Sequence, residues 1–326
     1  MKRNTLMILL VVLVLALSIP AALAQGPTFP ENGVTGVQAV NLDTSAATIQ
    51  ATYYATDGTP YALIDVELTN QGDSHTYYAE PGGNDSETQG TPTTFSGAAI
   101  LSADKQIAAI AITFFDSNGA GGAYGGSNAG STNVTLPLLL GDYYGQTSAI
   151  GIQNTDTATD VDVTVTFSPQ GGASFTQGYT IKAGSSTIID MGLDTTTFPE
   201  LWIGSATVTP DDGTTPLVAS VMIYTDNFVY AYTGFVETGM QWYLPLIRSE
   251  FAGLSTGVQV VAATSNDTVV TINYSGDIYN SSYQITQADY TCSVQATLPG
   301  GSSITFYNAG SWPLDDAIGA TVEAIT

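Results

Sequence analysis

The stretch LPLLLGDYYGQTSAIGIQN, residues 136–154, recurs without a gap as LPLIRSEFAGLSTGVQVVA, residues 244–262. The second half of this motif also occurs near the start of the chain, because Thr-Gly-Val-Gln stands both at 35–38 and at 256–259. Self-similarity at a fixed period indicates a repeat protein. A period of about 110 residues is too long for a solenoid unit and suits a β-sandwich domain. The sequence therefore predicts three tandem repeats, of which the third is the shortest.

Alternating apolar and polar residues mark the strands inside each repeat. ATIQATYY at 47–54, VDVTVTF at 161–167 and TVVTINY at 268–274 carry apolar side chains at every second position, which is typical of half-buried strands. Asp-Gly and Gly-Gly pairs supply turns between the strands, and no stretch has helical periodicity. The glycine-rich segment at 119–130 favours a flexible loop. The predicted fold class is all-β, with tandem antiparallel β-sandwich domains.

The N-terminal residues have the composition of a secretory signal peptide. Lys2 and Arg3 precede an apolar run, and Ala22-Leu23-Ala24 supplies the small residues of a cleavage site. The apolar run is shorter than the roughly 20 residues of a membrane-spanning helix, so an uncleaved anchor is the weaker alternative. We expect a protein secreted to the cell surface or the medium, with no membrane span in the mature chain.

The repeat boundaries are expected at the Leu-Pro motifs, which would be short extended linkers. The expected division is a signal peptide at 1–24, repeat one at 25–135, repeat two at 136–243 and an incomplete repeat three at 244–326.

The charge balance is strongly acidic. Five Lys and Arg residues oppose 29 Asp and Glu residues, for a net charge of −24. Such a surface repels phosphate, which excludes nucleic-acid binding and disfavours anionic membranes. Divalent cations or basic partners are conceivable ligands for the carboxylates. Solubility outside the cell is the simpler explanation for the acidic surface.

His75, the only histidine, is the first candidate for a catalytic residue. Asp73-Ser74-His75 contains the residue types of a hydrolase triad, but adjacent strand residues point to opposite faces, whereas triad members must converge. A single histidine also excludes a histidine-rich zinc site, and no phosphate-binding glycine loop is present. The sequence predicts no catalytic residue, no cofactor and no enzyme.

The candidate metal site is an acidic cluster of Asp156, Asp160 and Asp162. They lie in a turn ahead of a strand, where carboxylates and backbone carbonyls could bind calcium. Their spacing is not that of a dedicated calcium loop, so solvated turn residues are the favoured interpretation. Cys292, the only cysteine, is expected to be a small buried residue in a strand, with an intermolecular disulfide as the alternative.

Five N-x-S/T sequons mark candidate glycosylation sites at the surface of a secreted protein. They begin at Asn84, Asn133, Asn266, Asn273 and Asn280.

Several short motifs recur between the repeats. In repeat two they are Gly204-Ser205-Ala206-Thr207-Val208, the segment 216–221, Tyr232-Thr233-Gly234-Phe235 and Tyr243-Leu244-Pro245-Leu246. In these motifs the mature chain resembles a loosely defined class of bacterial secreted and cell-surface repeat proteins. The resemblance implies immunoglobulin-like sandwiches displayed outside the cell, and it implies no substrate. Repeat one departs from the pattern, because Gly122-Ala123-Tyr124-Gly125 replaces the Y-x-G-F segment.

The predicted function is that of an extracellular structural or adhesive protein of the cell surface, a matrix or a filament. One alternative is a carbohydrate-binding protein that uses exposed aromatic residues around 228–235 and 241–243. A second alternative is a β-sandwich hydrolase that depends on a pair of carboxylates.

Repeat three is predicted to lack a closing strand. In the first two repeats an apolar strand, QIAAIAI at 106–112 or PLVASVMI at 216–223, follows the Gly-Ala or Gly-Ser-Ala strand, and the third copy at 318–322 has no such successor. The expected result is an open edge that pairs with another chain. Truncation of a longer protein is the preferred explanation. Strand donation, by another surface protein or by self-assembly, is the alternative, although the proline-containing segment 25–33 is a poor donor.

Overall fold

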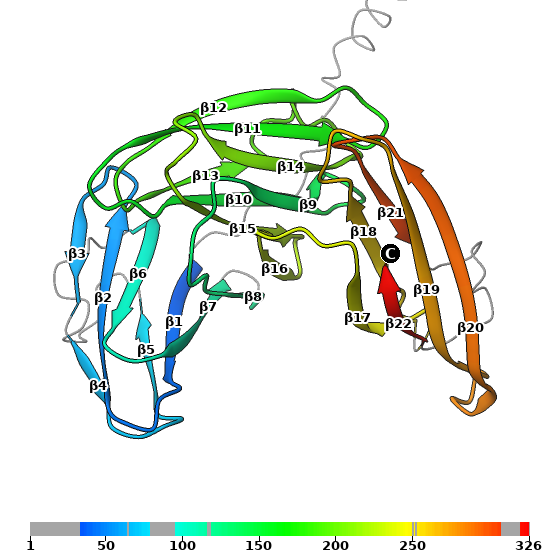
Figure 1. Ribbon diagram of the computed structural model, residues 1–326, viewed down its shortest axis with the longest axis horizontal. Coiled ribbons are helices and arrows are strands. Elements are labelled where there is room, and N and C mark those ends of the chain that lie inside the picture. Colours follow the sequence, from blue (N-terminus) through cyan, green and yellow to red (C-terminus); the bar gives the residue numbers. More distant parts are fainter. Residues whose placement is uncertain are drawn as a thin grey trace, which may run out of the picture.

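The computed structural model describes residues 33–63, 65–78, 95–115, 119–249, 251 and 253–307, together with the backbone of 320–325 (Figure 1). These residues form antiparallel strands, and none of them lies in a helix. The all-β prediction is therefore confirmed. No helix long and apolar enough to cross a membrane is found in this part of the chain. The predicted signal peptide and Asn84 lie outside the described residues.

Repeat two has the fullest set of strands and serves as the reference. Its two four-stranded sheets have the orders β12-β11-β14-β9 and β13-β10-β15-β16. The strands are β9 (Val134–Gly141), β10 (Thr147–Asn154), β11 (Val161–Pro169), β12 (Phe175–Ile181), β13 (Ser186–Asp190), β14 (Trp202–Pro210), β15 (Leu217–Tyr224) and β16 (Val229–Thr233). The immunoglobulin sheets A-B-E-D and C-F-G differ from these two orders, and the immunoglobulin-like detail of the prediction is not confirmed.

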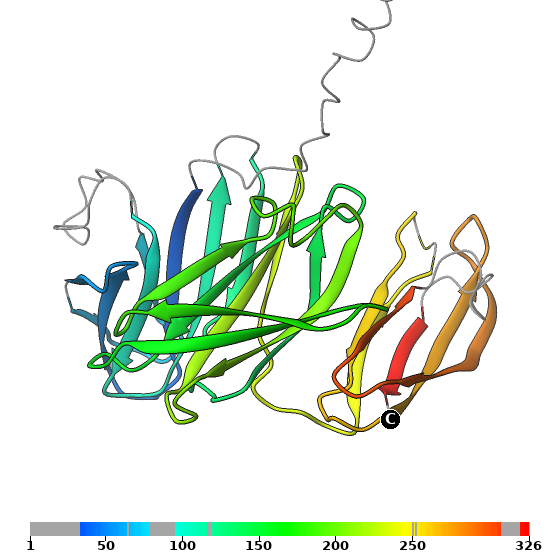
Figure 2. The same ribbon diagram turned by 90° about the horizontal axis from the view of Figure 1, so that it is seen from above.

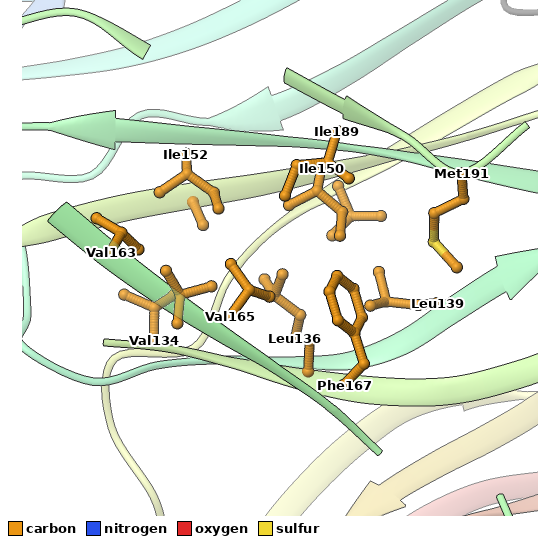
Figure 3. Packing of buried hydrophobic residues seen from close by; sticks show 14 of the residues in the cluster. Val134, Leu136, Leu139, Ile150, Ile152, Val163, Val165, Phe167, Ile189 and Met191 are labelled. Carbon is orange, nitrogen blue, oxygen red and sulfur yellow. The ribbon is translucent and has the colours of Figure 1, made fainter. Parts of the chain in front are cut away.

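The core of repeat two lies between these sheets (Figure 3). Val163, Val165 and Phe167 on β11 face Ile150 and Ile152 on β10, and all five side chains are fully buried. Burying such a side chain contributes about 1.5–3 kcal/mol relative to leaving it in water. The alternation seen in the sequence thus becomes one continuous apolar layer.

Repeat one has the same strand order over most of its length. Its sheets are β5-β1-β7-β8, matching β13-β10-β15-β16, and a sheet in which β2 pairs with β3, β4 and β6. The strands are β1 (Gly33–Asn41), β2 (Ala47–Ala55), β3 (Pro60–Ala62), β4 (Val66–Leu68), β5 (Ser74–Tyr78), β6 (Gly97–Ala103), β7 (Ile107–Phe115) and β8 (Gly121–Gly125). Among the described residues, nothing pairs with β6 where β9 pairs with β14.

The described part of repeat three matches the β9–β14 part of repeat two. Its sheet β20-β19-β22-β17 matches β12-β11-β14-β9, and its sheet β21-β18 matches β13-β10. The strands are β17 (Trp242–Ile247), β18 (Gly257–Val261), β19 (Thr268–Tyr279), β20 (Ile285–Leu298), β21 (Ser303–Tyr307) and β22 (Ala320–Ile325). The described residues of repeat three contain no counterpart of β15 or β16. Figure 2 shows the three groups of strands side by side in a row, in sequence order.

Equivalent core positions confirm the alignment of the repeats. The buried positions Val163, Val165 and Phe167 correspond to Ile49, Ala51 and Tyr53 on β2, and to Val270, Ile272 and Tyr274 on β19. All nine side chains are buried.

Two local predictions were wrong. The Leu-Pro motif is not a linker: Leu136-Pro137-Leu138 lies inside β9, an edge strand, at the point where the register with β14 shifts. An edge position with a bulge tolerates proline because no ladder hydrogen bond needs its nitrogen. The glycine-rich segment at 119–130 is not a loop throughout, because β8 occupies Gly121–Gly125 and pairs with β7.

A fully buried asparagine ends the second strand of repeat two. The Asn154 side-chain nitrogen donates to the carbonyl oxygens of Thr159, Ile181 and Lys182 at 2.7, 3.5 and 3.4 Å, and its oxygen accepts from the Asp156 N–H at 3.0 Å. One amide thus ties the β10–β11 turn to the end of β12.

Repeat one uses the same device at Asn41. Its nitrogen donates to the carbonyls of Ser45, Leu68 and Asn70, and its oxygen accepts from Asp43 N–H. The equivalent position of repeat three is Ala262, which is buried and has no such side chain.

Replacing Asn154 by alanine is expected to lower the free energy of unfolding by about 2 kcal/mol, because buried carbonyl groups lose their donor. Chemical denaturation of the purified chain measures the change. Asn227→Ala, at an exposed turn position, is the matched control and should change stability by less than about 0.5 kcal/mol. Equal effects of the two substitutions would contradict the structural role of Asn154.

Candidate functional site

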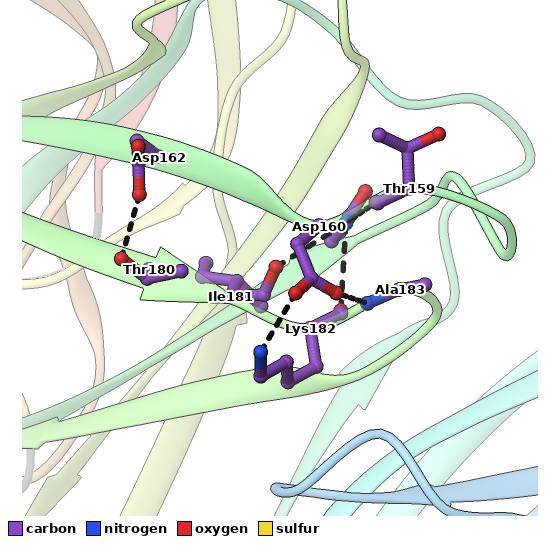
Figure 4. Close-up of polar contacts among 8 residues, drawn as sticks. Thr159, Asp160, Asp162, Thr180, Ile181, Lys182 and Ala183 are labelled. Carbon is purple, nitrogen blue, oxygen red and sulfur yellow. Dashed lines mark hydrogen bonds and ion pairs between the residues drawn. The ribbon is translucent and has the colours of Figure 1, made fainter.

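The three aspartates of the acidic cluster have separate partners; Figure 4 shows those of Asp160 and Asp162. Asp160 forms an ion pair with Lys182 at 2.7 Å and accepts from Ala183 N–H, while Asp162 accepts from the Thr180 hydroxyl at 2.6 Å. Asp156 accepts from the N–H of Ala158 within its own turn. The hydrogen bond from Lys182 lowers the pKa of Asp160.

The structure does not bring these three carboxylates together as a ligand set. In the part of the chain that the structure describes, no group of three His, Cys, Asp or Glu residues is placed to hold a metal ion. Calcium binding remains a prediction without a geometric site.

The Asp73-Ser74-His75 sequence does not form a triad. His75 lies on the edge strand β5 and packs edge-on against the Tyr77 ring, with 4.6 Å between ring centroids. The Asp73 carboxylate accepts from the backbone and side-chain N–H groups of Asn70, and the Ser74 hydroxyl accepts from Gln38. Asp73 and Ser74 are thus used in separate hydrogen bonds, and His75 in a ring contact.

Cys292 lies on β20 and is half-buried. Burial raises the pKa of its thiol, so the thiolate form that reacts with oxidants and metals is disfavoured. Of the described sequons, Asn133 and Asn266 are exposed. Asn273 accepts from the Ser293 hydroxyl, and Asn280 accepts two backbone N–H groups in its turn.

A shallow depression of about 310 Å³ lies on the outer face of β1 and β7. Its lining includes Gln38, Val40, Ser74, Ala108 and Ile110, and no lining residue is titratable. It offers one amide and one hydroxyl group and no acid–base chemistry.

The most elaborate contact outside the cores is the junction between repeats one and two. There β8 of repeat one lies against β16 of repeat two. The Thr233 hydroxyl donates to the Gly125 carbonyl at 2.6 Å, and the Tyr124 side chain is hydrogen-bonded to Ser220 on β15. Burial raises the pKa of Tyr124.

An apolar cluster fills this junction. It contains Phe115 and Ala120 of repeat one together with Ala149, Tyr224 and Val229 of repeat two, and all five are buried. The Tyr224 hydroxyl donates to the Asp190 carboxylate at 2.6 Å, and burial together with that carboxylate raises the pKa of Tyr224.

A second contact lies at the other end of the junction. The Ser185 hydroxyl donates to the Ala55 carbonyl at 2.5 Å, and Gly184 has a positive φ of 69° beside the Tyr54 ring. A β-carbon on Gly184 would lie 2.6 Å from that ring, so only glycine fits. Two separated contacts of this kind fix the orientation of repeat one on repeat two.

No protein-family model matches the chain, and no curated protein matches it. The resemblance to secreted bacterial repeat proteins and the immunoglobulin-like detail therefore stay at the level of expectations. The geometry offers two interaction features for a functional argument: the fixed junction, and the uncovered side of repeat three.

Gly122 on β8 offers a test of the junction, because its β-carbon would lie 3.0 Å from Val229. Gly122→Leu should push β8 away from β16 and destabilise the junction by about 1–3 kcal/mol. Thermal unfolding and amide exchange of β8 report the change. Gly125→Leu is the matched control, since a β-carbon there meets nothing within 4 Å. Identical behaviour of the two variants would show that the β8–β16 contact is dispensable.

We expect Asp212 to make the stability of the fold depend on pH. Its carboxylate accepts from the Thr215 hydroxyl, Thr215 N–H and Thr214 N–H, which lower its pKa from 3.8 to about 2. A depressed pKa stabilises the fold above the unfolded-state value, and the stabilisation is lost as pH falls through about 2. The melting-temperature difference between wild type and Asp212→Asn should therefore shrink between about pH 4 and pH 2. Glu237→Gln, at an exposed position, serves as the control.

Proposed function

We propose that this protein is an extracellular structural or adhesive component of a cell surface, a matrix or a filament. The observation that carries the proposal is one strand order that is complete in repeat two and recurs in part in repeats one and three, with the first two repeats joined by a buried apolar cluster and a hydrogen bond. Repetition extends the reach of a protein and multiplies weak contacts. A fixed junction keeps that reach from collapsing through hinge motion.

The surface chemistry supports the same proposal. Charged residues make up only 10% of the sequence, and the large acidic excess keeps extended copies apart in solution. Several carboxylates are engaged as turn acceptors: Asp43 accepts from Ser45, Asp57 from Thr59 and Asp194 from Thr197. These three aspartates stabilise the turns in which they lie.

Carbohydrate binding is the second candidate, and exposed aromatic rings favour it. Tyr243 is 69% exposed on β17, and Phe228 and Tyr230 are stacked with 6.0 Å between centroids. Trp242 is turned against Phe235 in an edge contact, and neighbouring strand residues point to opposite faces. Trp242 and Tyr243 therefore do not make a single stacking platform.

Expression of the full chain in a secreting bacterial host tests the proposal. The expected result is mature protein outside the cell, beginning at Gln25, that associates with the surface or forms assemblies visible by electron microscopy. Ala24→Phe removes the small residue before the cleavage position and should leave the leader attached. Protein that stays in the cytoplasm, or saturable binding to one sugar on a glycan array without assembly, would count against the structural role.

A further inference from the structure

The edge of β18 that faces away from β21 is unpaired among the described residues, and it is the strongest candidate for a further binding site. In repeat two, β10 pairs with β13 on one side and with β15 on the other. In repeat one, β1 likewise pairs with β5 and β7. In repeat three, β18 pairs with β21, and no second strand of the described residues is hydrogen-bonded to it.

Backbone hydrogen bonds identify which groups face that side. Asn154 N–H donates to Ser185 O, on the β13 side, whereas Thr155 N–H donates to Pro216 O, on the β15 side. The counterpart of Asn154 in repeat three is Ala262, whose N–H donates to Ser302 O. Because residues of an antiparallel strand alternate between their two neighbours, Gly257, Gln259 and Val261 direct their N–H and C=O groups to the open side.

Side-chain exposure shows that the core is also uncovered there. Val134, Leu136 and Ile152 of repeat two are fully buried. Their counterparts are Trp242, which is 38% exposed, and the half-buried Leu244 and Val260. Both sheets of repeat three thus expose apolar side chains along one side.

In repeat two this side is closed by the hairpin of β15 and β16. Gly234, which follows β16, lies so close to β9 that a β-carbon on it would be 2.6 Å from Val134. Phe235 pairs with Thr135, and the Tyr232 hydroxyl donates to the Leu138 carbonyl at 2.6 Å. The hairpin therefore fills the core and bridges from β10 to β9.

The hairpin that covers this side of repeat two turns apolar side chains toward the core. On β15 the buried inward side chains are Leu217, Ala219, Val221 and Ile223. The hairpin β7–β8 of repeat one has the same place in its sheet, and the buried side chains of β7 are Ala111, Thr113 and Phe115. A β-hairpin therefore fills this position in both repeats.

We propose that the open side of repeat three is an acceptor site for a β-hairpin of the β15–β16 type, whose first strand adds to the open edge of β18. This goes beyond the proposed structural function and does not require it, because the site is defined by the ladder and the uncovered core. An exposed edge with an adjacent apolar groove is the usual geometry of β-strand addition. In register with repeat two, Val258 would face the position of Val221.

The test uses the full chain and a synthetic peptide with the sequence of residues 216–235. Amide exchange of Gly257, Gln259 and Val261 should slow at least about tenfold on addition of the peptide, which is the effect of about 1.4 kcal/mol of binding. Exchange at Val258 and Val260, which face β21, should change little. A peptide carrying Val221→Asp, on the inward side, should fail, whereas one carrying Met222→Asp, on the outward side, should still protect.

A pair of protein variants gives the matched control. Val261→Pro removes an N–H on the open edge of β18 and should abolish protection by the peptide. Tyr307→Pro places the same residue on the far edge of β21 and should not. Slow exchange of the edge amides at high protein concentration without peptide would also support the site. If the peptide displaces that self-association, a second copy of the chain is the donor. No protection by any peptide, or edge amides already protected in the monomer, would overturn the proposal while leaving the structural function open.

Discussion

Coverage of each apolar sheet face by a second layer is the constraint on which the whole arrangement depends. In repeat two, β9 and β16 meet at one side and complete that coverage. Repeat one has no described strand in the place of β9, so the side of β8 that carries Gly122 and Tyr124 lies instead on repeat two. Two equivalent tyrosines show this difference. Tyr232 is hydrogen-bonded to Leu138 of its own repeat, whereas Tyr124 is hydrogen-bonded to Ser220 of the next repeat.

Much of the fold could be predicted from the sequence, because burial follows the period-2 pattern closely. Ile49, Val163 and Val270 all proved to be buried core positions. The Leu-Pro motif misled because proline disfavours a central strand, and the sequence does not reveal that β9 is an edge. The segment around Gly122 misled because glycine allows flexibility and also allows close approach. Only the contact with Val229 shows which property is used.

The burial of Asn41 and Asn154 was not predicted, although the sequence contains a pattern that indicates it. Asn-x-Asp-Thr occurs at 41–44 and again at 154–157, and a polar residue repeated at the end of an apolar strand suggests a buried hydrogen-bonded turn. That the described residues of repeat three contain no counterpart of β15 could be anticipated, because the repeats can be compared with each other. The junction could not be anticipated, since it depends on which faces remain uncovered after each sandwich forms.

The absence of an asparagine at Ala262 has a mechanical consequence. In the described part of repeat three, β18 is paired with one strand, and Ala262 stands where the first two repeats have the asparagine that clamps the following turn. Under a pulling force such a strand can peel away one hydrogen bond at a time, whereas β10 must break bonds on both sides at once. An unfilled third repeat would thus yield at low load and act as an extensible element, while the first two repeats hold their length.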